Sequence, residues 1–263
     1  MTVLEETRSD LARPVLRNEV LLVLGVSLGA SAAYSIVNLI EKLTRPIPLS
    51  SQTTSLNTSV TPGRPWLDLT YQLMGVFFNV VPALLAVHLL RRDHPGALGQ
   101  LGLDPSRVGR RPWFDLGAGA VLAAVIGIPG LALYMLARAL GINTTVAAAN
   151  LPSVWWAVPV LVLAAAGNAV VEEVVVVGYL LTRLRDLGVR TWHAVVASAL
   201  LRGSYHLYQG IGGFVGNAIM GVVFALFYLR TRRLLPLIIA HTLLDVVAYL
   251  GYTLLHDKVA FLR

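Results

Sequence analysis

The sequence contains no cysteine among its 263 residues, and only 13% of its residues are charged. The lack of cysteine excludes disulfides, thiolate metal ligands and a cysteine nucleophile. The charged fraction is about half of that usual in soluble domains, whereas 56% of the residues are hydrophobic. This composition predicts an all-α fold, a polytopic bundle of membrane-spanning helices.

The net charge of +7 would suit a nucleic-acid binder. The basic residues, however, gather between apolar stretches, so we expect the lipid bilayer as the partner and no nucleic acid. Hydropathy predicts about seven spans. They lie at 20–42, 68–90, 114–140, 154–183, 191–208, 213–229 and 234–255.

The distribution of Lys and Arg predicts the orientation of these spans. Of the 21 basic residues, 14 fall in the N-terminal segment or in the loops after the second, fourth and sixth predicted spans. The positive-inside rule therefore places the N-terminus in the cytoplasm and the C-terminus outside. We expect an integral membrane protein of a bacterial plasma membrane. The five tryptophans at predicted span ends are typical of an aromatic belt.

Two adjacent glutamates, Glu172 and Glu173, interrupt the apolar run 164–181. A charged side chain at the centre of a bilayer costs at least ~2.5–3.5 kcal/mol, so such a residue indicates a functional site. Other ionisable residues lie within later predicted spans as Arg202 with His206 and as His241 with Asp245.

Each of these pairs is spaced i, i+4, as are Asn168 and Glu172, so each pair shares one helix face. Polar residues within a membrane face the bundle interior. We therefore expect three polar faces to meet at a single site. Asn168 is expected mainly to hydrogen-bond between helices, with orientation of Glu172 as a second possibility.

A carboxylate and a histidine can activate water, and a second histidine can donate to an oxyanion, which is the layout of a peptidase. Glu172, His206 and His241 could instead bind zinc. The sequence has no HExxH motif. Both the metal-free mechanism and the zinc mechanism stay open at this point.

Three motifs resemble the CPBP family of CAAX-protease and bacteriocin-processing intramembrane enzymes, which includes the Ras-converting endopeptidases. The family pattern is E-E-x-x-x-R, then F-x-x-x-H, then H-x-x-x-N/D. The chain offers Glu172-Glu173, His206, and His241 with Asp245 in this order over about residues 160–250. The resemblance implies that Glu172 and His206 activate water, and that His241 and Asp245 line an oxyanion site. Because an ionised aspartate cannot donate, we expect Asp245 to orient His241.

The chain departs from the family pattern at two positions. Val177 stands where the pattern has arginine, and Arg202 stands where it has phenylalanine. Without an arginine at 177, Glu173 lacks its i, i+4 partner, and an unpaired buried charge is costly. We therefore predict that Arg202 forms an ion pair with Glu173 from the neighbouring helix.

Together these features predict an intramembrane endopeptidase that acts on a membrane-associated peptide or protein and requires no cofactor. Zinc dependence is the first alternative. A catalytically silent membrane scaffold or immunity protein is the second, and a proton-relay transporter is the third. We expect a cytoplasmic tail over 1–18, membrane spans over 19–153, a catalytic membrane core over 154–255 and a C-terminal tail over 256–263.

Overall fold

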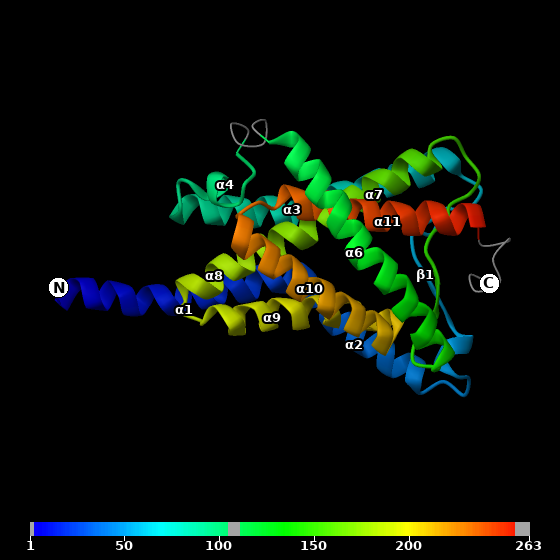
Figure 1. The fold of residues 1–263 in the computed structure, drawn as a ribbon, viewed down its shortest axis with the longest axis horizontal. Coiled ribbons are helices and arrows are strands. Elements are labelled where there is room, and N and C mark those ends of the chain that lie inside the picture. The colour runs from blue at the N-terminus through cyan, green and yellow to red at the C-terminus, as the bar shows by residue number, and fades with distance from the viewer. Residues whose placement is uncertain (1–2, 105–110, 256–263) are drawn as a thin grey trace.

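The computed structural model describes residues 3–104 and 111–255, with side chains described from 13 to 254 within those ranges. The described chain is elongated, and most of its helices run along the long axis (Figure 1). Its helices are α1 (Val3–Gly25), α2 (Leu28–Leu43), α3 (Pro65–Asp93), α4 (Ala97–Gln100), α6 (Pro112–Ala139), α7 (Ala157–Glu172), α8 (Leu180–Asp186), α9 (Thr191–Ser204), α10 (Ile211–Thr231) and α11 (Leu235–Leu255).

Five helical segments are long and apolar enough to cross a membrane. They are α3, α6, the continuous stretch Ala157–Asp186, α10 and α11. These segments correspond to the second, third, fourth, sixth and seventh predicted spans. The chain is therefore an integral membrane protein with an essentially all-α fold, and its orientation in the bilayer stays a prediction.

The first predicted span, 20–42, is not one continuous helix. Helices α1 and α2 meet at a bend of 54°. The hydroxyl of Ser27 donates to the carbonyl oxygen of Val23 at 2.5 Å, a back-bond that competes with the helical pattern and bends helices. Counted as one broken span, this pair raises the candidate spans from five to six. Helix α1 also covers most of the segment 1–18 that we expected to be a tail.

The prediction of a span at 191–208 is wrong. Helix α9 has 14 residues, which gives it a length of about 21 Å, whereas a bilayer core is about 30 Å thick. The chain then turns through a short 3-10 segment, η3 (Leu207–Gln209), to Gly210. Gly210 has a φ of 122°, and a Cβ there would lie 2.5 Å from the carbonyl oxygen of Ile142. The residues of this turn, 204–210, are mostly polar, so the predicted span extends past the end of the apolar stretch.

The centre of the bundle is the stretch from α7 to α8. In its most apolar 18-residue stretch, 67% of the residues are buried inside the protein, compared with 11–33% in the corresponding stretches of the other candidate spans. Helices α3 and α11 pack against α7, while α9 packs against α10 and α8. The polar residues of the fourth predicted span therefore lie in the protein interior rather than against lipid.

Two short strands close one end of the bundle (Figure 1). Strand β1 (Thr53–Ser55) pairs in parallel with β2 (Thr145–Ala147). They join the segment before α3 to the segment before α7. An isolated β-bridge between Asn143 and Gly210 also connects the segment before α7 to the turn after η3. This end thereby supports the chain that follows α9.

Candidate active site

The polar residues predicted to meet do so at the junction of α7, α9 and α11. Glu172 ends α7 and Glu173 begins the next helical segment, while Arg202 and His206 come from the end of α9 and the turn that follows. His241 and Asp245 lie one turn apart on α11. From these three elements, the side chains of Arg202, His206 and His241 approach the two carboxylates to within 4 Å.

The predicted ion pair between Arg202 and Glu173 is confirmed. One terminal nitrogen of Arg202 lies 2.8 Å from both carboxylate oxygens of Glu173. Both side chains are 0% exposed. The guanidinium of Arg202 also lies 5.5 Å from the ring centroid of Phe224 on α10, a cation–π contact. The arginine missing at position 177 is thus replaced by one from α9.

Glu173 has a second partner, His241. The Nδ1 atom of His241 lies 2.7 Å from Oε1 of Glu173. We predicted that Asp245 orients His241, but Asp245 Oδ1 lies 3.8 Å from His241 Nε2, which is longer than a hydrogen bond. The imidazole is therefore oriented by its hydrogen bond to Glu173, whose carboxylate accepts from Nδ1–H of His241. This leaves Nε2 of His241 directed toward Glu172, at 3.8 Å from Oε2.

Glu172 lies at the meeting point of the site. Its Oε2 atom accepts a hydrogen bond from the hydroxyl of Tyr205 at 2.7 Å. The same oxygen lies 3.5 Å from a terminal nitrogen of Arg202 and 3.8 Å from Nε2 of His206. Sequence reasoning assigned Tyr205 no firm role. Its position three residues after Arg202 is the one signal that could have placed it beside the carboxylates.

A π-helical segment, η2 (Glu173–Tyr179), follows Glu172 directly. Such insertions into α-helices are rare and frequently occur at functional sites. The hydroxyl of Ser198 on α9 donates to the carbonyl oxygen of Val176 in this segment at 2.9 Å. Ser198 and Arg202 are one turn apart, so the same face of α9 contacts η2 through both residues. Val177, within the same segment, is fully buried.

His206 lies outside any regular helix, and its surroundings hold it in place. Beyond α9, the backbone N–H of Tyr208 donates to the Ser35 hydroxyl at 2.7 Å. The buried ammonium of Lys42 donates to the carbonyl oxygen of Tyr208 at 2.6 Å and to the Thr54 hydroxyl at 2.5 Å. Thr144 donates to the carbonyl oxygen of Gln209 at 3.0 Å. Helix α2, strand β1 and Thr144, the residue before β2, thus hold the turn that carries His206.

Asn168 does not orient Glu172 by any hydrogen bond between described residues. Its amide donates to the Tyr249 hydroxyl on α11 at 3.2 Å and accepts from Asn79 on α3 at 2.8 Å. The expected role between helices is confirmed. Tyr249 in turn donates to Oδ2 of Asp245 at 3.3 Å. Asp245 therefore bonds to Tyr249 on its own helix.

The donor set fits a zinc ion poorly. Among the described residues, no group of three His, Asp or Glu side chains has the arrangement of a metal site. The carboxylate of Glu172 already faces the Arg202 guanidinium at 3.5 Å and the Tyr205 hydroxyl at 2.7 Å. A dication at Glu172 would be repelled by that guanidinium.

Comparison with known proteins gives one match to a protein family. Residues 153–247 match the family described as Type II CAAX prenyl endopeptidase Rce1-like. The matched segment runs from just before α7 into α11 and contains every residue of the site from Glu172 to Asp245. No curated protein and no solved structure matches the chain. The resemblance inferred from the three motifs is confirmed by this match to the Rce1-like type II CAAX prenyl endopeptidases over residues 153–247.

Proposed function

We propose that the protein is an intramembrane endopeptidase in which Glu172 activates a water molecule. The observation that carries this proposal is the pair Glu172 Oε2 and His206 Nε2, which face each other at 3.8 Å. Nε2 of His206 is buried and has no hydrogen-bond partner among the described residues. Polar atoms separated by more than about 3.5 Å are commonly bridged by water. The pair is therefore suited to hold the nucleophile.

The proposed reaction is hydrolysis of a peptide bond. The water oxygen bonds to the carbonyl carbon while a proton passes to Glu172, which acts as the general base. His206 directs the lone pair of the water. Glu172 then returns the proton to the leaving amine as the carbon–nitrogen bond breaks. No other reactant is required.

His241 is placed to stabilise the tetrahedral intermediate. With Nδ1 fixed on Glu173, a protonated imidazole directs its Nε2–H toward the region between Glu172 and Asp245. A donor held in this way stabilises an oxyanion with little reorganisation. Asp245, 23% exposed at its side chain, lies 3.8 Å from the same Nε2 and borders this region.

The substrate is a membrane-associated peptide or protein, because the site is built from helices that are suited to span the bilayer. The match to prenyl endopeptidases over residues 153–247 is compatible with a lipidated substrate. The catalytic residues in this proposal are Glu172, His206 and His241. Glu173, Arg202 and Tyr205 are positioning residues, since they act through those groups.

The test compares purified wild type, Glu172→Gln and the surface control Glu41→Gln on a library of membrane peptides, with and without a chelator. Glu172→Gln should lower kcat by about 10²–10⁴-fold, the usual share of a general base. Glu41→Gln should cleave like wild type, because Glu41 pairs with Arg45 in an exposed ion pair.

Full activity of Glu172→Gln would remove the glutamate mechanism. Loss of wild-type activity on chelation with recovery on added zinc would favour the metal-dependent alternative. Cleavage by none of the three proteins would instead support the silent scaffold.

A further inference from the structure

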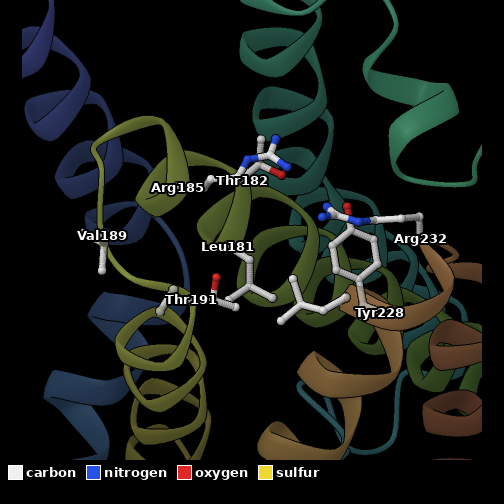
Figure 2. A pocket seen from close by; sticks show the side chains of 9 residues that line it. Leu181, Thr182, Arg185, Val189, Thr191, Tyr228 and Arg232 are labelled. Atoms are coloured by element: carbon white, nitrogen blue, oxygen red, sulfur yellow. The ribbon is translucent and has the colours of Figure 1, made fainter.

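A cavity of about 230 Å³ lies between α8, α9 and α10, apart from the candidate active site (Figure 2). Its polar wall is formed by Thr182, Arg185, Thr191 and Arg232, and apolar residues such as Leu181 and Leu229 form the remainder. The α8 and α10 walls of the cavity are near the ends of two candidate spans, Ala157–Asp186 and Ile211–Thr231. The cavity is therefore at the level where a spanning helix leaves the hydrocarbon.

The two arginines of the cavity come from different elements and turn toward the same space. In Figure 2 the side chain of Arg232 extends along the Tyr228 ring toward Thr182, next to which Arg185 lies. The guanidinium of Arg232 is 5.7 Å from the centroid of that ring. Arg232 also has a φ of 53°, a conformation that usually favours glycine at the end of a helix. An arginine is therefore held here at some cost in backbone energy.

The arginines near Arg185 and Arg232 in the sequence each pair with carboxylates of the protein. Arg183 is buried and pairs with Glu19 and Asp93 at 2.8 and 2.7 Å. Arg233 donates to both carboxylate oxygens of Asp115, and this hydrogen bonding raises the pKa of its guanidinium.

Arg185 and Arg232 form no ion pair with any residue whose side chain the structure describes. The two arginines near each other in sequence, Arg183 with Arg185 and Arg232 with Arg233, therefore have different partners in both cases. One guanidinium binds a carboxylate of the fold, and the other faces the cavity. Two cations that share a cavity without an anion repel each other, and an anionic ligand would remove that repulsion.

We propose that this cavity binds the phosphate group of an anionic membrane lipid. Guanidinium groups bind phosphate oxygens in a bidentate manner. The hydroxyl of Thr191 and the first turn of α9 add donors on the opposite wall. Basic pockets between transmembrane helices are known to hold lipid headgroups. The position at the ends of two spans and the apolar part of the wall favour a lipid over a soluble phosphate.

This proposal does not depend on proteolytic activity, so binding is measured directly. The full-length protein in detergent is titrated with fluorescent phosphatidic acid, and the bound lipid is displaced by unlabelled competitors. Wild type should bind saturably, and unlabelled phosphatidic acid should displace the probe far better than phosphatidylcholine. The variant R185Q/R232Q should bind about tenfold to a hundredfold more weakly, because charge-assisted hydrogen bonds are lost.

The matched control is R190Q/R230Q. Arg190 and Arg230 are exposed basic residues near the same helix ends, but they do not line the cavity. This variant removes the same charge and should weaken binding by less than about threefold. Equal weakening in both double variants would overturn the proposal in favour of diffuse attraction. Displacement by inorganic phosphate at the same concentration as phosphatidic acid would overturn the assignment to a lipid.

A second variant tests the cavity without changing its charge. Val189→Trp places a large side chain in the cavity wall and keeps both arginines. Loss of saturable binding in Val189→Trp, with an unchanged thermal melting temperature, would support the cavity as the site. Unchanged binding in this variant would overturn it, as would the absence of saturable binding in wild type.

Discussion

Glu172 and Glu173 are adjacent in sequence, but their environments differ. Glu173 is 0% exposed, and its carboxylate bonds to Arg202 and His241. Glu172 accepts one short hydrogen bond, from Tyr205, while a guanidinium nitrogen of Arg202 lies 3.5 Å away and two imidazole nitrogens lie 3.8 Å away. The short contacts of Glu173 to a guanidinium and an imidazole suit a structural role, whereas the longer contacts of Glu172 leave room for a water molecule with which it can exchange a proton.

The same contrast separates the elements that supply the two halves of the site. Arg202 lies within α9, and its position is fixed by helix packing. His206 lies beyond the helix, on a turn that depends on Ser35, Lys42 and Thr144 for its position. One half of the site is therefore built into the bundle core, and the other is held from outside the family-matched segment.

The largest expected effect on stability comes from Glu173→Gln. This change leaves the buried guanidinium of Arg202 without a full counter-charge and should lower the free energy of unfolding by about 3–5 kcal/mol. Unfolding in mixed micelles measures this loss. Glu172→Gln is the matched control, because it keeps an oxygen that can accept from Tyr205 and should lose much less stability.

A double change isolates the buried ion pair. Glu173→Leu combined with Arg202→Met removes both charges, and such apolar replacements often restore stability. The double variant should be more stable than Glu173→Gln, although Nδ1 of His241 loses its partner. If the double variant is less stable than Glu173→Gln, the unpaired charge of Arg202 is not the source of the lost stability.

Part of this site could be predicted because a charge in lipid demands a partner. That requirement, with the i, i+4 spacing of each motif, led to the convergence of three helices and to the ion pair between Arg202 and Glu173. Five of the seven predicted spans also coincide with helices long enough to cross a membrane.

The remaining features depend on tertiary contacts that hydropathy does not encode. The π-helical segment after Glu172 lies in apolar sequence, and the end of α9 comes before a polar stretch, 204–210, that the hydropathy prediction includes in a span. The hydrogen bonds from Lys42 to Thr54 and to the turn after His206 connect segments up to 166 residues apart. The contact of Tyr205 with Glu172 depends on where that turn begins.

The next largest effect is expected for Tyr205→Phe. Loss of its hydrogen bond to an ionised carboxylate should cost about 1.5–3 kcal/mol and should lower kcat more than it changes KM, because Glu172 loses its orientation. Tyr208→Phe is the control, since the Tyr208 hydroxyl bonds to Gln209 rather than to Glu172. Equal effects of the two changes would show that Tyr205 acts only in packing.

Lys42→Met tests the external support of His206. It removes the shorter of the two hydrogen bonds that the Tyr208 carbonyl oxygen accepts and leaves the one from the Thr54 hydroxyl at 3.2 Å. This loss should cost about 0.5–1.5 kcal/mol and should lower kcat by about tenfold through misplacement of His206. Arg45→Gln is the matched control, because it removes a cation one turn away that forms only an exposed ion pair. Unchanged kcat in Lys42→Met would mean that α2 does not position the histidine.

The smallest effect is expected for Asn168→Leu. Asn168 lies one turn from Glu172, yet its hydrogen bonds go to Asn79 and Tyr249 on other helices. Hydrogen bonds between membrane helices contribute about 0.6 kcal/mol on average, so the variant should unfold slightly more easily. Because no described contact links Asn168 to the carboxylate, kcat should stay as in wild type. A large loss of kcat with unchanged stability would instead place Asn168 in the catalytic machinery, and Glu172 would then need an orienting partner besides Tyr205.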